Sequence, residues 1–160
     1  MPSGNALVDE KILEAIRFVA RSLLSELYID DFTPNETNGI KVFRRERRAA
    51  EELMAVLQDA GTSDEDKAAV REAVLLLIEA DRRIVDTAIQ AAQTAASNAG
   101  CNDATPPTGC GQVLSKIFQA EAERALAEED VVAENYDEAI VHLRRAWKRA
   151  LRAVELAGLI

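Results

Sequence analysis

The stretch that decides the fold is AEAERALAEEDVVAENYDEAIVHLRRAWKRALRAVEL, residues 120–156. Acidic residues predominate before the central Asn135 and basic residues after it, and the second half carries Trp147, the only tryptophan in the chain. Apolar side chains recur in both halves at steps of three and four residues, which is typical of amphipathic helices. A short turn between two helices makes them pack antiparallel. We therefore predict a helical hairpin against which the rest of the chain packs.

The composition favours helices throughout the chain. Hydrophobic residues make up 48% of the 160 residues, but aromatic residues only 4%, so the core must consist mainly of Ala, Leu, Val and Ile. Alanine is the best helix former, and it is spread here through long segments with almost no Gly or Pro. A chain of this length forms one domain with a substantial core. We predict a single all-α domain spanning residues 1–160.

Turn residues divide that domain into five helices. Clusters of Pro, Gly and Asn mark two long loops, at 30–39 and 98–111, and shorter breaks fall near Gly61 and Asn135. The expected architecture is a five-helix antiparallel bundle, with helices over residues 6–28, 40–60, 63–97, 112–133 and 136–157. Thr62 with Glu65, and Asn135 with Glu138, have the spacing of reciprocal helix caps.

Apolar periodicity predicts which side chains face inward. In the first helix the predicted inward residues are Ile12, Ile16, Val19, Leu23 and Leu27, widened by Leu13, Ala20 and Leu24. In the third they are Val70, Val74, Leu77, Asp81, Ile84, Ala88, Ala91 and Ala95. In the fourth they are Leu114, Phe118, Ala122, Ala125, Leu126 and Val132. In the fifth they are Ile140, Leu143, Trp147, Ala150, Leu151 and Val154.

Asp81 interrupts the apolar stripe of the third helix. A carboxyl group on a buried face must be paired, hydrogen-bonded or protonated. One interpretation is an acid with a perturbed pKa in a functional site. The favoured interpretation is a structural carboxylate that accepts a hydrogen bond from an Arg or from the indole N–H of Trp147.

Cys101 and Cys110 lie in the same loop, and the chain has no other cysteine. We predict a disulfide between them, against the alternative of two free thiols. A disulfide favours an exported protein, because the cytosol keeps thiols reduced.

The loop at 30–39 carries two short patterns. Asn35 begins an Asn-Glu-Thr glycosylation acceptor, which matters only in an exported chain. Asp31, Thr33 and Asn35 alternate like the start of a calcium loop, but Glu36 replaces the required Gly and Val42 the distal Glu. The simplest interpretation is a solvated loop that binds no metal.

Basic residues gather on two helix faces. They are Lys41, Arg44, Arg45 and Arg48 in the second helix and Arg145, Arg149 and Arg152 in the fifth. They predict either sites for an anionic partner or solvated faces balanced by acidic neighbours. The net charge of −9 argues against a nucleic-acid binder.

Motifs for catalysis are missing from the sequence. It has one histidine, His142, which helical phase predicts to be exposed, and no phosphate-binding glycine loop or nucleophile elbow. No apolar run approaches the length needed to cross a bilayer. We expect neither enzymatic activity, nor a cofactor, nor a membrane span.

Three blocks resemble the FIMAH family of small helical modules. They are residues 135–147, residues 40–43 with the charged run that follows and 51–53, and residues 78–89, in the family's order. The resemblance implies an all-helical accessory domain of longer exported proteins, with no catalytic residues to carry over, and it places Asp81 in a family pattern. Tyr136, Ala139, Leu143 and Ala146 are similar to one helix of a tetratricopeptide repeat, but no second repeat follows.

Together these features predict a non-catalytic structural or interaction module, located outside the cell or at its surface. It would act as an accessory domain or as a self-associating subunit, with another protein or a second copy as partner. The alternative is a cytoplasmic protein that binds an anionic partner through a basic helix face.

Overall fold

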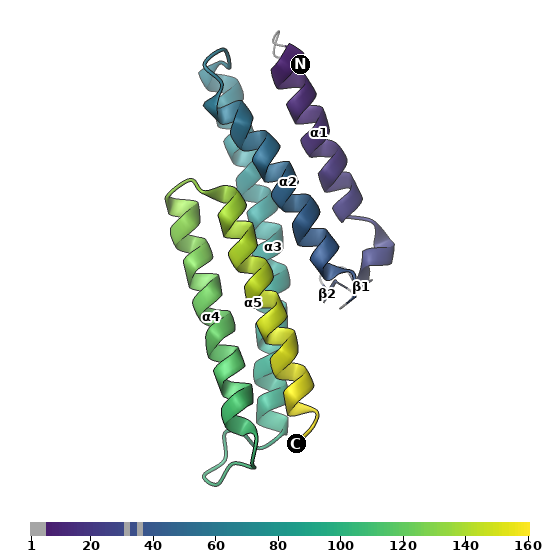
Figure 1. The fold of residues 1–160 in the computed structure, drawn as a ribbon, viewed down its shortest axis with the longest axis vertical. Coiled ribbons are helices and arrows are strands. Elements are labelled where there is room, and N and C mark those ends of the chain that lie inside the picture. The colour runs from purple at the N-terminus through teal and green to yellow at the C-terminus, as the bar shows by residue number, and fades with distance from the viewer. Residues whose placement is uncertain (1–5, 31–32, 35–36) are drawn as a thin grey trace.

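The computed structural model describes residues 6–30, 33–34 and 37–160, and it confirms an all-α bundle of five helices. The elements follow one another as α1 (Ala6–Ser22), a 3-10 turn η1 (Ser25–Leu27), β1 (Tyr28–Asp30), β2 (Thr33–Pro34), α2 (Gly39–Gln58), α3 (Asp64–Asn98), α4 (Cys110–Val132) and α5 (Tyr136–Ala157). Successive helices run antiparallel (Figure 1).

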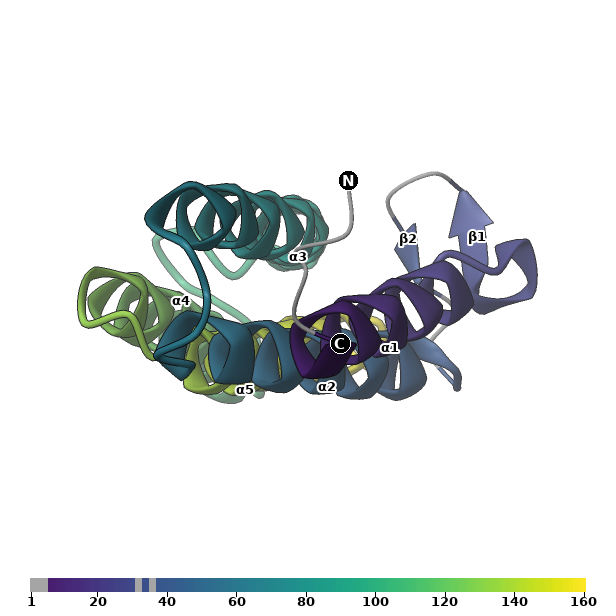
Figure 2. The same cartoon turned by 90° about the horizontal axis from the view of Figure 1, so that it is seen from above.

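The long helix α3 holds the molecule together. Its 35 residues span about 50 Å, at 1.5 Å per residue. Figure 1 shows α1 and α2 beside one end of α3, and the predicted α4–α5 hairpin beside the other. Seen from above, α4, α5, α2 and α1 form a row, and α3 lies over one side of it (Figure 2). The position of α3 leaves α1, at the end of the row, packed principally against α2.

Trp147 joins the two halves of the bundle. It is buried where α5 meets α2, and its ring centroid lies 5.7 Å from that of Phe43. Gly39, the first residue of α2, packs against the edge of the indole, where a Cβ would lie 2.5 Å from Cζ2. The absence of a side chain at Gly39 therefore allows the start of α2 to approach α5.

Alanines bring α3, α4 and α5 close together. The buried set is Ala88, Ala92, Ala96, Ala120, Ala127, Ala139, Ala146, Ala150 and Ala153. On α3 the predicted stripe is confirmed through Ala88, but Ala92 and Ala96 replace the predicted Ala91 and Ala95. The predicted stripe takes a three-residue step from Ala88 to Ala91, whereas the buried residues continue in four-residue steps to Ala92 and Ala96, and Ala95 is partly buried against the core.

The first helix is shorter than predicted, and its predicted inward face is only partly correct, since Ile12, Val19 and Leu27 lie inward as predicted. It ends at Ser22 rather than Tyr28, because Leu24 adopts an extended backbone, and β1 pairs antiparallel with β2. This break turns the chain back over α2, where Leu27 is buried, and that burial offsets the lost helical hydrogen bonds. The residues that face α2 are Val8, Ile12, Ala15, Val19 and Ser22. The predicted inward residues Leu13, Ile16, Ala20, Leu23 and Leu24 are exposed instead.

The inward face of α4 is also different from the prediction. Val113, Ile117, Ala120 and Ala127 are buried, whereas Leu114, Phe118, Ala122, Ala125, Leu126 and Val132 are exposed. The physical reason is the close contact of α4 with α5, which leaves room mainly for small side chains.

Both predicted helix caps are wrong. Ser63, not Thr62, caps α3: its Oγ accepts a hydrogen bond from the Asp66 N–H at 3.1 Å. Thr62 instead donates to Oδ2 of Asp59 at 3.0 Å. The Asn135 side chain forms no cap bond, because its backbone N–H closes the end of α4 on the Asp130 carbonyl, and Glu138 lies 3.8 Å from Arg47.

Candidate functional site

Asp81 of α3 and Glu46 of α2 form a pair of buried carboxyl groups inside the bundle. Asp81 is fully buried, and Glu46 is only 3% exposed. Burial, followed by the neighbouring Glu46, holds the pKa of Asp81 well above its ordinary range. The protonated form of Asp81 is therefore favoured over that of an ordinary carboxyl group. A protonated carboxyl can donate to a second one, and Glu46 is the acceptor beside it.

This pairing corrects the predicted partner of Asp81. No N–H or O–H group of the described residues donates to either Asp81 oxygen or to Oε2 of Glu46. Arg82, the next residue, binds Glu128 at 2.7 Å instead. Trp147 packs against Phe43, and its indole N–H donates no hydrogen bond to either carboxyl oxygen of Asp81. The prediction of an Arg or Trp donor is wrong because side chains next to Asp81 in sequence point to other faces of α3.

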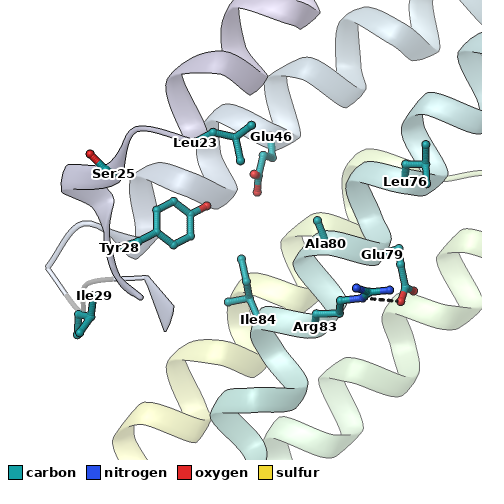
Figure 3. Close-up of a pocket in the computed structure, with 10 residues that line it drawn as sticks. All are labelled: Leu23, Ser25, Tyr28, Ile29, Glu46, Leu76, Glu79, Ala80, Arg83 and Ile84. Atoms are coloured by element: carbon teal, nitrogen blue, oxygen red, sulfur yellow. Dashed lines mark hydrogen bonds and ion pairs between the residues drawn. The ribbon is translucent and has the colours of Figure 1, made fainter. Parts of the chain in front are cut away.

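A cavity of about 670 Å³ lies beside this pair. It opens between α3 and the segment that leads from α1 into β1, and Glu46 forms part of its lining (Figure 3). The apolar side chains that line it are Leu23, Ile29, Leu76, Ala80 and Ile84, and the polar ones are Ser25, Tyr28, Glu79 and Arg83. In Figure 3 the Tyr28 hydroxyl and the Glu46 carboxyl point toward each other, while Arg83 turns to Glu79 at 3.2 Å.

The pKa of the Tyr28 phenol reflects the surroundings of this side chain in the cavity. Burial raises the pKa of its phenol, and the nearby Glu46 and Asp81 raise that pKa further. The phenol therefore stays protonated and can donate a hydrogen bond. Burial, the largest cause, disfavours charge of either sign, and only the smaller contribution of the two carboxyl groups disfavours negative charge in particular.

Most of the predicted basic residues have partners in the structure. Arg45 donates to the Arg21 carbonyl, and Lys41 to Oδ1 of Asn38 at 2.8 Å. Arg48 lies over the ring of Phe18, 5.8 Å from its centroid. Arg44 is exposed, and among the described residues no carboxylate forms an ion pair with it.

The basic residues of α5 are balanced by acidic neighbours. Arg145 and Arg149 lie 3.9 and 3.5 Å from the carboxylate of Glu123, and Arg152 pairs with Glu155. Glu123 also binds Nδ1 of His142 at 2.7 Å. The prediction that His142 is exposed is wrong, because it lies between α4 and α5 with Asp130 on its other side, 3.6 Å from Nε2.

The cysteines pair as the sequence predicts. Their Sγ atoms are bonded at 2.06 Å, and the bond joins the end of α3 to the first residue of α4. The glycosylation acceptor Asn35 lies outside the described residues.

Sequence reasoning missed Glu46 and the outer face of α1. Glu46 stands among basic residues in the sequence, although its phase follows Val42 and Phe43 and precedes Ala49 and Ala50, all of which are buried. This helical phase was the feature of the sequence that could have identified Glu46 as buried. On α1, Leu13, Ile16 and Leu23 are 54%, 57% and 64% exposed. When a helix has two apolar stripes at helical spacing, periodicity alone does not show which of them packs against the core.

Within the residues that the structure describes, no three His, Cys, Asp or Glu side chains are grouped so as to hold a metal ion. No helix in that part of the chain is long and apolar enough to cross a membrane. No family model matches the sequence, and no curated protein or solved structure is found to be similar to it.

Proposed function

We propose that this protein is a non-catalytic helical interaction module, exported from the cell or displayed on its surface, that self-associates through the outer face of α1. The observation that supports the proposal is a second apolar stripe on α1, formed by Leu13, Ile16, Ala20 and Leu23. We call these four residues the outer stripe.

The outer stripe has the spacing of a helix-packing seam. Its members are separated by three, four and three residues, as in the a and d positions of a coiled coil. A neighbouring face of α1, about 100° around the helix, already packs on α2 through Val8, Ala15 and their neighbours. Contiguous exposed apolar surface of this kind marks interaction sites. A second helix laid along the outer stripe would bury it.

Charge favours a second copy of the chain as the partner. The whole chain carries a net charge of −9, which repels copies from one another. Helix α1 is locally neutral, because Asp9, Glu10 and Glu14 are balanced by Lys11, Arg17 and Arg21. Two copies can therefore meet at α1 with less repulsion than elsewhere, and a two-fold contact uses the same surface on both.

Two features support a location outside the cytoplasm. The Cys101–Cys110 disulfide is stable in an oxidising compartment. The FIMAH modules that the sequence resembles are accessory parts of exported proteins, and self-association through α1 would link the longer proteins that carry them.

Light scattering across a concentration series tests the proposal. The wild type should change from monomer to dimer as its concentration rises. Ile16→Glu should remain monomeric, because a charge in the seam would be buried without a partner. The matched control is Phe118→Glu, which changes a side chain 71% exposed on α4, away from α1 (Figure 1), and should dimerise like the wild type. A wild type that is monomeric throughout, or an Ile16→Glu variant that dimerises equally well, would refute self-association through α1.

A further inference from the structure

We propose that the cavity between β1 and α3 binds a small aliphatic amine, with its ammonium group at the Glu46 carboxyl and its carbon chain along the apolar wall. This inference is separate from self-association. The site lies on the α3 side of the α1–β1 segment, and among the outer-stripe residues only Leu23 also lines the cavity.

The cavity has the dimensions and walls of a ligand site. Its volume of about 670 Å³ lies within the range of roughly 300–1,000 Å³ that is usual for small-molecule pockets. Leu76, Ala80 and Ile84 form one wall on α3, and Leu23 and Ile29 face them from the other side (Figure 3). These side chains suit a hydrocarbon body.

Glu46 supplies the specific polar contact. It lines the cavity, yet it is only 3% exposed, and its Oε2 has no donor among the described residues. A buried carboxylate without a donor is costly, and an ammonium group would supply both a hydrogen bond and a counter-charge.

The guanidinium groups of the nearby arginines each bind another carboxylate or a backbone carbonyl. Arg83, at the rim of the cavity, pairs with Glu79. Arg82 binds Glu128 and Glu79, and Arg45 donates to the Arg21 carbonyl. Arg47 pairs with Glu51 at 3.1 Å and lies near Asp137. Among the described residues, none of these guanidinium groups therefore pairs with Glu46, and the cavity gives an external ammonium group access to it.

A single positive charge matches this site. Burial and the neighbouring Glu46 raise the pKa of Asp81, which favours its neutral form and leaves Glu46 as the carboxyl group that lines the cavity. The hydroxyl of Tyr28, whose raised pKa keeps it protonated, points toward the Glu46 carboxyl (Figure 3). A primary ammonium on a hydrocarbon chain satisfies the charge and the apolar wall together.

The test uses n-hexylamine, with hexan-1-ol as the neutral molecule of the same chain length. Each is titrated into the full chain while backbone amide signals are followed by NMR. Hexylamine should shift the signals of Tyr28, Glu46 and Ile84 and should bind at least about tenfold more tightly than hexanol. Glu46→Gln should remove that preference. The matched control is Glu79→Gln, which changes a rim carboxylate already paired with arginines and should leave the preference intact.

Ala80→Leu provides a second variant that leaves the buried carboxyls untouched. Ala80 lines the cavity from an exposed position of α3, so a larger side chain there should block the amine while the fold persists. No saturable shift with millimolar hexylamine, equal binding of amine and alcohol, or unchanged binding to Ala80→Leu would each overturn the proposal.

A lysine side chain carries the same ammonium group as a free amine. Nα-acetyl-lysine N-methylamide is therefore included as a third ligand. If it binds more tightly than hexylamine, the assignment to a free amine is wrong. Ile16→Glu should bind hexylamine like the wild type, which separates failure of this site from failure of self-association.

Discussion

Glu46 and Asp81 place two carboxyl groups together in the contact between α2 and α3, where both are shielded from water. Two ionised carboxylates in that position would repel each other and lose their hydration. One shared proton removes the repulsion and supplies the missing donor. Burial beside Glu46 therefore favours the protonated form of Asp81 in the native structure.

This protonation predicts how the stability of the bundle depends on pH. The pKa of Asp81 is raised in the folded state, so the folded chain holds a proton that the unfolded chain releases above about pH 4. Its stabilising contribution is complete below that pH and is lost as the pH rises toward the folded pKa. Within this window the free energy of unfolding should fall by up to about 1.4 kcal/mol per pH unit through this group.

Asp81→Asn is the variant that isolates this effect. The amide can donate to Glu46 but does not titrate, so the variant should lack this part of the pH dependence. Urea unfolding from pH 4 to pH 8 compares the two proteins, and the carboxyl groups that do not interact with Asp81 contribute equally to both. Parallel curves for the wild type and the variant would mean that Asp81 does not hold a proton in the native state.

Gly39 predicts a steric limit on the contact between α2 and α5. Its backbone is helical, so alanine is acceptable there apart from the collision of its Cβ with the Trp147 indole. Gly39→Ala should lower the free energy of unfolding by about 1–3 kcal/mol, as overpacking of a core does. Gly111→Ala is the control, because a Cβ at that position of α4 meets nothing within 4 Å. It should leave stability unchanged or raise it by up to about 1 kcal/mol. Equal effects of the two substitutions, measured by chemical unfolding, would contradict the contact.

The disulfide should stabilise the fold by restricting the loop that it closes in the unfolded chain. Cys101 and Cys110 are nine residues apart, and loop-entropy estimates give roughly 2–3 kcal/mol for such a loop. Replacing both cysteines by alanine should lower the free energy of unfolding by that amount. A reductant should destabilise the wild type similarly and leave the double variant unchanged. If intact mass shows no loss of two hydrogens in the native protein, the bond and the argument for export both fail.

The accuracy of the sequence predictions followed the strength of the local signals. The bounds of α5 agree with the prediction. Both long loops contain Pro or Gly, which disfavour a helix that continues through them. No Pro or Gly lies between Ser22 and Asp30, so no turn residue in the sequence indicated that α1 ends at Ser22. On α4, large side chains such as Phe118 suggested the wrong face, because the true contact with α5 consists of small residues.

The candidate site was less predictable than the fold. Asp81 could be identified as buried because it interrupts an apolar stripe. Its partner Glu46 lies 35 residues earlier in the chain and between arginines, and only the packing of α2 on α3 brings the two together. The cavity also depends on the chain from Leu23 to Ile29, most of which was predicted to be the last part of the first helix.

The proposed function depends on whether the outer stripe of α1 contacts a second copy. Isotope-filtered NMR on a mixture of methyl-labelled and unlabelled chains detects only contacts between copies. Self-association through α1 predicts NOEs from the Ile16 methyl group to Leu13 or Leu23 of the other copy at concentrations where the dimer forms. Intermolecular NOEs confined to other surfaces, or none at any concentration, would contradict it.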